Sequence, residues 1–120
     1  MIILDYKDTR PIYEQIVEKF KLLILKGVLM KDEQMPSVRS LAMELSINPN
    51  TIQKAYAELE RQGYIYTIKG RGNFILDNGA LLEKKKEELK ERLLGLYREG
   101  REFGMKKSDF MDCLNAVKED

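Results

Sequence analysis

Apolar residues recur at helical spacing in three segments between residues 10 and 63. The segments run from Arg10 to Lys26, from Val38 to Ser46 and from Pro49 to Gly63. Each leaves polar residues on its other side, which is typical of a helix that packs one face on a core. The residues expected to point inward are Ile12, Ile16, Phe20, Leu23 and Ile24, then Val38, Leu41, Ala42 and Leu45, then Ile52, Ala55, Tyr56 and Leu59.

Residues with known end preferences flank these helices. Pro11 suits the first turn of the first helix, and Gly27 and Gly63 suit the ends of the first and third helices. The expected N-caps are Thr9 or Asp8 for the first helix, Ser37 for the second and Asn48, followed by Pro49, for the third.

Two β-rich runs follow the third helix. Tyr64–Ile68 and Asn73–Leu76 flank the turn Lys69-Gly70-Arg71-Gly72, a pattern that predicts a β-hairpin. The order helix, helix, helix, hairpin predicts one small domain over residues 1–77, mainly α with a small β-hairpin.

The remaining residues, 78–120, which we call the tail, predict two helices. The first is highly charged and carries leucines at spacings of seven, four and three, which form a heptad-like seam of Leu82, Leu89, Leu93 and Leu96. Gly100 and Gly104 are expected to end it. Ser108 is expected to cap a last helix, with an apolar face of Phe110, Met111, Leu114 and Val117.

Composition narrows the possible functions. The chain has 120 residues, 43% of them hydrophobic and 34% charged, which is typical of a soluble globular protein. Its longest apolar run is four residues, so we expect no membrane span, and the N-terminus has no signal-peptide pattern. A lone cysteine, Cys113, excludes an internal disulfide and favours the cytoplasm. Histidine is absent, which removes the usual zinc sites and catalytic triads, so we expect neither an enzyme nor a cofactor or metal.

The placement of charge is more informative than its total. Residues 1–76 hold 11 Lys and Arg against 9 Asp and Glu, and residues 77–120 hold 10 against 11. Residues 45–57, in contrast, contain no acid at all, and the outer face of the third helix carries Asn50, Thr51, Gln53 and Lys54. A polar surface without negative charge is what a helix needs beside phosphates.

Two short helices joined by a tight turn form a helix-turn-helix pattern, whose second helix enters the major groove. The amides of Asn50 and Gln53 can bond base edges, Thr51 can hydrogen-bond or touch a thymine methyl, and Lys54 can meet a phosphate or guanine. Asn48 and the helix N-terminus favour a phosphate oxygen. A polar outer face is also ordinary for any surface helix, so the pattern alone leaves both interpretations open.

Two further features favour DNA. Arg39, beside Ser37, lies where such a motif approaches the DNA backbone, although it can instead pair with Glu44 or Asp32. At the hairpin tip, Lys69 and Arg71 can enter a minor groove or grip phosphates. A phosphate-binding loop would need a following helix, whereas a strand follows here, so the hairpin is better interpreted as the wing of a winged helix.

The run from Met35 to Ile75 resembles the DNA-binding domain of GntR-type bacterial transcription regulators. The similarity covers residues 8–76, and its matching features are Pro36-Ser37-x-Arg39-x-Leu41-Ala42, Asn48-x-x-Thr51-Ile52, Ala55-Tyr56, Leu59, Gly63 and Gly70-x-Gly72-x-Phe74. The resemblance implies DNA contacts at Arg39, Asn48, Asn50, Thr51, Gln53, Lys69, Gly70 and Arg71. Many members have an arginine where this chain has Pro49 or Gln53, so the resemblance does not imply an operator sequence.

The tail, with about 44 residues after the wing, resembles that of the short YtrA-like subfamily, where it is a dimerisation device. We therefore expect a homodimeric repressor on a palindromic operator, with a dimer surface of Leu82, Leu89, Leu93, Leu96, Tyr97, Phe110 and Leu114. The seam can instead fold back on its own domain.

A winged helix that binds protein rather than DNA is the alternative function. We expect most of five methionines to fill the core: Met30, Met35, Met43, Met105 and Met111. The alternative role for them is to line a pocket for an apolar effector.

Overall fold

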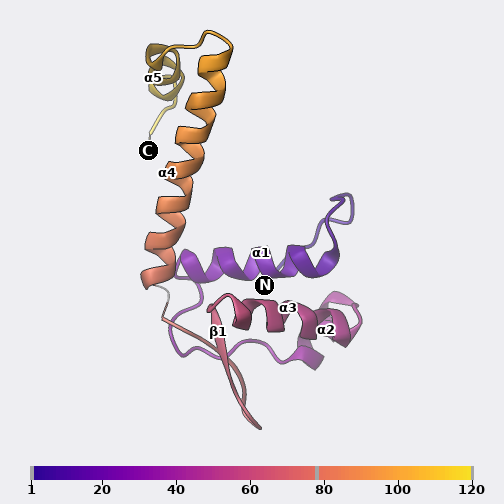
Figure 1. The fold of residues 1–120 in the computed structure, drawn as a ribbon. Coiled ribbons are helices and arrows are strands. Elements are labelled where there is room, and N and C mark those ends of the chain that lie inside the picture. The colour runs from indigo at the N-terminus through magenta and orange to yellow at the C-terminus, as the bar shows by residue number, and fades with distance from the viewer. Residues whose placement is uncertain (1, 78, 120) are drawn as a thin grey trace. The chain divides into compact units, whose positions relative to one another are not determined.

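The structure is a computed structural model that describes residues 2–77 and 79–119. Figure 1 shows mainly helices and one small hairpin, as the sequence predicts. The elements are α1 (Ile12–Leu25), α2 (Val38–Leu45), α3 (Pro49–Arg61), β1 (Ile65–Ile68), β2 (Gly72–Ile75), α4 (Gly79–Glu102) and α5 (Lys107–Asn115). They form two compact units, residues 1–82 and 83–120. None of the described helices combines the length and apolar character needed to cross a membrane.

The core of the first unit lies between α1, α2 and α3, with α1 packed along α3. The expected inward residues confirm the helical stripes, because Ile12, Leu23, Val38 and Leu45 are partly buried against the core and the others are fully buried. At its centre the rings of Phe20 and Tyr56 meet edge to face at 5.8 Å, an arrangement that aromatic pairs favour.

Of the three N-caps predicted for the helices of the first unit, two are confirmed and one is wrong. The Ser37 hydroxyl accepts a hydrogen bond from the Ser40 amide at 3.0 Å, and the Asn48 side chain accepts from the Asn50 amide at 2.8 Å. Helix α1 begins instead at Ile12, with Pro11 as its N-cap and no side-chain cap, so neither Thr9 nor Asp8 caps it. The Asp8 carboxylate is occupied by Arg10, whose side-chain hydrogen bonds hold the pKa of Asp8 below its usual value.

Gln15 is the one buried polar side chain of the described core, and its side chain organises the N-terminal segment. It accepts a hydrogen bond from the Asp5 amide and donates to the Asp5 carbonyl, both at 3.0 Å, and it also donates to the Arg10 carbonyl at 3.3 Å. Burial of an amide costs little when its groups are paired in this way. The sequence pattern gave no indication of this role.

The hairpin pairs β1 with β2 in antiparallel register, from Ile65 opposite Ile75 to Ile68 opposite Gly72. Its strands begin one residue away from the predicted positions. Tyr64 stays outside β1 because its amide donates back to the Leu59 carbonyl at 2.9 Å and closes the end of α3. Gly72 belongs to β2 because it pairs with Ile68.

In the second unit, α5 packs on α4 through the rings of Tyr97 and Phe110, whose centroids lie 5.4 Å apart. Three predictions for the tail are wrong. Gly100 lies within α4 rather than at its end, and Val117 lies beyond α5. The N-cap of α5 is Lys106 rather than Ser108, because the Asp109 carboxylate accepts the Lys106 amide at 2.7 Å.

The prediction that most methionines fill the core is also wrong. Met35 is buried with 3% exposure, whereas the others are exposed on the surface: Met30, Met43, Met105 and Met111. Met30 and Met105 lie in loops and Met43 lies outside the inward stripe of α2, whereas Met111 lies in α5 at the edge of an open groove beside α4.

The last turn of α3 holds Glu58 between two partners. Its carboxylate accepts hydrogen bonds from the Arg61 guanidinium and, at 2.7 Å, from the Gln62 amide. The hydrogen bonds from Arg61, and then from Gln62, lower the pKa of Glu58 from 4.5 to about 2.

A carboxyl group whose pKa is lower in the folded protein than in the unfolded chain stabilises the fold at pH values above the unfolded pKa. This stabilisation is lost as the pH falls through the folded pKa. The free energy of unfolding should therefore fall between pH 4.5 and about 2, and more steeply for the wild type than for Glu58→Gln. Urea unfolding followed by circular dichroism at several pH values tests this. Parallel curves for the two proteins would contradict it.

A Cβ atom on Gly100 would lie 2.5 Å from Cζ of Phe110, whereas one on Gly95 would meet nothing within 4 Å. Gly100→Ala should therefore destabilise the packing of α5 on α4 by about 1–3 kcal/mol, as overpacked sites do. Gly95→Ala is the matched control and should stabilise α4 by about 1 kcal/mol, since alanine is the better helix former. Thermal unfolding of both full-length variants makes the comparison, and equal stabilisation by the two would show that Phe110 does not require the glycine.

Candidate nucleic-acid interface

A three-residue turn sets α3 against α2. Ser46 adopts a left-handed conformation, with φ of 55° and ψ of 45°, and ends α2. The Ile47 amide then donates to the Ala42 carbonyl at 3.0 Å, and Asn48 caps α3. The turn therefore separates α2 from α3 within Ser46–Asn48 and leaves Asn48, Pro49 and Asn50 exposed at the N-terminus of α3.

The outer face of α3 carries the residues that the sequence predicts for base contacts. Asn50, Gln53 and Lys54 are exposed, and Thr51 is half-buried. Within the described part of the chain, the side-chain amides of Asn50 and Gln53 make no hydrogen bond. The first acid of α3 is Glu58, two turns after Asn50. The N-terminal half of α3 therefore offers unpaired donors and acceptors without negative charge, as base recognition requires.

Lys54 differs from its neighbours because it already has a partner. Its ammonium group lies 3.9 Å from the centroid of the Tyr13 ring on α1, a cation–π contact. Tyr13 was missed by sequence reasoning because it lies in a different helix, 41 residues away, and no spacing rule links the two. The contact places the N-terminal end of α1 beside the outer face of α3.

Arg39 is exposed in the first turn of α2. Neither of the alternative ion pairs is found, since Arg39 has no ion pair in residues 2–77 and 79–119. The Asp32 carboxylate accepts the Tyr66 hydroxyl at 2.8 Å instead. The guanidinium is therefore exposed on the surface near the cap of α2.

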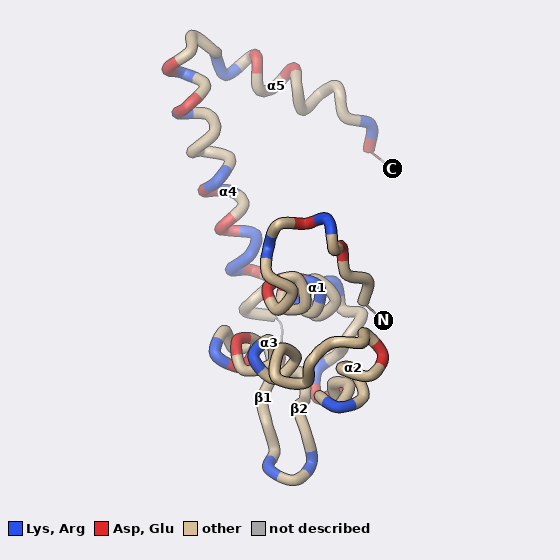
Figure 2. Tube along the Cα trace, turned by 90° about the vertical axis from the view of Figure 1, so that its right-hand side faces the viewer, with Lys and Arg blue, Asp and Glu red and all other residues tan. Residues whose placement is uncertain are grey.

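The hairpin tip holds the remaining predicted contacts, Lys69, Gly70 and Arg71, and all three are exposed. Gly70 has φ of +79°, which the tight turn requires and which other residues rarely adopt. Figure 2 shows the hairpin extending beyond the helices of its unit, with basic positions at its tip. Among the described residues, no acid pairs with Lys69 or Arg71.

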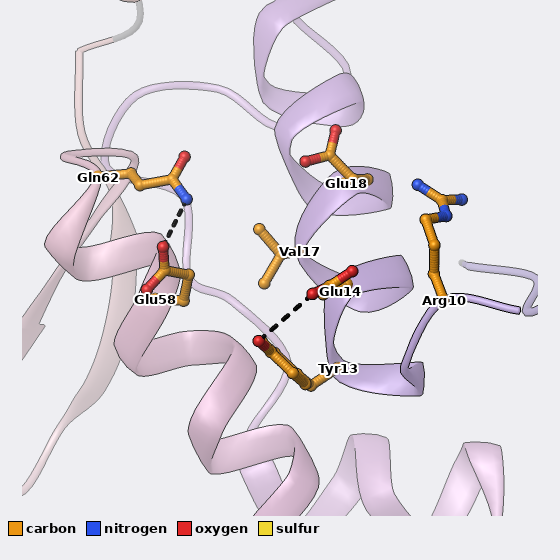
Figure 3. A pocket seen from close by; sticks show the side chains of 7 residues that line it. All are labelled: Arg10, Tyr13, Glu14, Val17, Glu18, Glu58 and Gln62. Atoms are coloured by element: carbon orange, nitrogen blue, oxygen red, sulfur yellow. Dashed lines mark hydrogen bonds between the residues drawn. The ribbon is translucent and has the colours of Figure 1, made fainter.

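A hollow of about 450 Å³ between α1 and α3 has the opposite character (Figure 3). Its walls include three carboxylates, and the lining residues are Arg10, Tyr13, Glu14, Val17, Glu18, Glu58 and Gln62. Negative charge here would repel phosphates, so a nucleic-acid surface ends where this hollow begins. No group of acids, cysteines or histidines in the described part of the chain is arranged to hold a metal ion.

The second unit carries the predicted dimer residues on an apolar surface, except for Leu82, which is the last residue of the first unit. Leu89, Leu93, Leu96 and Leu114 expose about half of their area, whereas Leu82, Tyr97 and Phe110 are half-buried. A groove of about 410 Å³ lies between α4 and α5, lined by Leu93, Leu94, Tyr97, Lys107, Phe110, Met111 and Leu114.

Comparisons with known proteins agree on one family. The family model for bacterial regulatory proteins of the gntR family matches residues 12–75. The HTH-type transcriptional repressor YtrA of Bacillus subtilis (strain 168) is 39% identical over 122 aligned positions, covering 100% of this chain and 94% of the relative.

Solved structures agree. A GntR family transcriptional regulator from Listeria monocytogenes has a TM-score of 0.76 and 33% identity, covering 96% of this chain and 100% of its own. The AraR DNA-binding domain in complex with operator ORE1 has a TM-score of 0.54 and 29% identity, over 61% of this chain and 89% of its own. These relatives are transcription regulators and not enzymes. The chain therefore belongs to the GntR family of bacterial transcription regulators.

Proposed function

We propose that the protein is a transcriptional repressor that binds a palindromic operator as a homodimer, with α3 in the major groove and the hairpin at the minor groove. The observation that carries the proposal is the acid-free N-terminal half of α3, where the side-chain amides of Asn50 and Gln53 are exposed. Residues 1–77 would bind DNA and residues 78–120 would join two copies. Such a protein would act in the cytoplasm, where bacterial DNA lies.

In this arrangement the residues divide the work between bases and phosphates. Asn50, Thr51 and Gln53 lie at the outward end of α3 and would read base edges, because amides bond adenine in pairs and threonine can touch a thymine methyl. Arg39 and the N-terminus of α3, capped by Asn48, would fix the position of the helix on the DNA backbone.

Lys54 and the wing would add basic contacts beside the base contacts of α3. The ammonium of Lys54, held over Tyr13, would sit between the bases and the phosphates next to α1. The thin tip formed by Lys69, Gly70 and Arg71 would follow the minor groove or its phosphates. Both would bind through charge, and salt would weaken both.

Dimerisation through the second unit would supply the two-fold symmetry. Its half-exposed leucines lie together, unlike the single apolar residues that are scattered over most protein surfaces. Contact with a second copy would remove this apolar surface from water. Repression is proposed from the YtrA relative, whose name describes a repressor and which aligns along the whole chain. The alternative function is a winged helix that binds only protein. If the protein shows no salt-sensitive DNA binding, this alternative is favoured.

Fluorescence anisotropy with promoter DNA tests the proposal across a salt series. We expect affinity of nanomolar class that falls steeply with salt, on the order of that of other specific DNA-binding proteins. Arg39→Ala should weaken binding to all sequences and reduce the salt slope by about 1, because one phosphate contact is lost.

Gln53→Ala should act differently, costing about 1–3 kcal/mol on the matched operator and little on scrambled DNA. Lys26→Ala, which removes an exposed charge at the far end of α1, is the control and should bind as the wild type does. If the wild type and Arg39→Ala bind equally weakly at every salt concentration, the DNA-binding proposal is wrong.

Leu89→Glu should reduce the yield of crosslinked dimer, because it places a charge on the apolar seam. Lys84→Glu introduces the same residue on the opposite face of α4 and should leave the yield unchanged. Chemical crosslinking and sedimentation measure both variants. An unchanged yield for Leu89→Glu would remove this seam from the interface.

A further inference from the structure

The loop before α2, residues 32–37, lies beside the hairpin in the place of a third strand. It lies alongside β2, and Gln34 makes an antiparallel bridge with Phe74. The backbone hydrogen bonds run from the Asp32 amide to the Ile75 carbonyl (2.8 Å), from the Ile75 amide to the Glu33 carbonyl (3.0 Å) and from the Met35 amide to the Asn73 carbonyl (2.8 Å). The base of the wing is therefore fixed by backbone contacts, as in a sheet.

The backbone bonds to this loop end at Asn73, and the side chain of Gln34 continues the contact toward the tip. Its Nε2 donates to the carbonyl of Arg71 at 2.9 Å, between residues 37 positions apart in the sequence. Gly72 leaves the space for this approach: a Cβ there would lie 2.9 Å from the same Nε2, and its φ of +123° is one that other residues rarely adopt. The amide thus packs across the bare face of Gly72 to reach Arg71.

The other end of the same loop is joined to α3. The Tyr56 hydroxyl donates to the Pro36 carbonyl at 2.7 Å. Tyr56 belongs to α3 and is buried in the hydrophobic core of the first unit. Ser37, the next residue, caps α2 and leads to Arg39. One short loop therefore contacts α3, α2 and the wing tip, the three places that the proposed function assigns to DNA.

We propose that Gln34 is a positioning residue for operator recognition, which holds Arg71 at a fixed distance from α3. The inference rests on the proposed function and adds a residue to which that function assigns no contact with DNA. With the carbonyl of Arg71 held by Gln34, the wing tip is ordered before binding, so less conformational freedom is lost when it meets the DNA. Without this bond the loop 32–37 would contact only the base of the hairpin, and the tip would be held only by the hairpin itself, whose strand pairing ends at Ile68 and Gly72.

A double-mutant cycle tests the proposal with the full-length protein and an operator selected from a random DNA pool. Gln34→Leu keeps a similar volume and removes the donor. It should weaken operator binding roughly fivefold, about the value of one neutral hydrogen bond. In an Arg71→Ala background, which keeps the carbonyl that Gln34 holds but lacks the side chain that it positions, the same change should have a smaller effect.

Gln62→Leu is the matched control, since Gln62 bonds Glu58 at the C-terminal end of α3 and should not affect DNA binding. Equal losses from Gln34→Leu in both backgrounds, or no loss at all, would overturn the inference. Circular dichroism melting checks that each variant folds.

Backbone ¹⁵N relaxation without DNA gives a second measurement that does not depend on the proposed function. Order parameters of residues 69–72 should fall in Gln34→Leu while those of β1 and β2 stay unchanged. If they do not fall, the positioning inference is wrong even when DNA binds. If the wild type binds no DNA but the wing still loosens, the proposed function fails and the structural role of Gln34 remains.

Discussion

The inner face of α3 packs Ile52, Ala55, Tyr56 and Leu59 against α1 and α2, and none of the four side chains is more than 1% exposed. Fully burying a large apolar side chain contributes about 1.5–3 kcal/mol, so rotating α3 by even a third of a turn would lose most of this stabilisation. The orientation of the outer face follows directly. Asn50 and Gln53 point outward because Ile52, Ala55 and Tyr56 are required inside.

Charge along α3 follows the same division. The N-terminal half has no acid, whereas Glu58 near the C-terminal end accepts hydrogen bonds from Arg61 and Gln62 beside the acidic hollow next to α1. The positive end of the helix dipole also lies at the N-terminus, where it favours anions. Local charge and helix polarity therefore agree on one end of α3 as the place for a phosphate-bearing partner, and the net charge of +1 for the whole chain does not reveal this.

Close approaches depend on glycine at two places in the chain. Gly72 gives Gln34 access to the wing, and Gly100 receives the ring of Phe110 within the second unit. Sequence reasoning assigned Gly72 only to a turn and Gly100 to a helix end, because a glycine is interpreted first through its backbone freedom. Its lack of a side chain becomes informative only when the neighbouring residue is known.

The sequence by itself determined the helices, their inward stripes, the caps at Ser37 and Asn48, the hairpin and the acid-free face. These features depend on residues within a few positions of one another, where periodicity and capping rules act. The tertiary structure decided that Lys54 lies over Tyr13, that Gln34 reaches Arg71 and that Gln15 holds the N-terminal segment. Those contacts join different segments of the chain, and only packing brings such segments together.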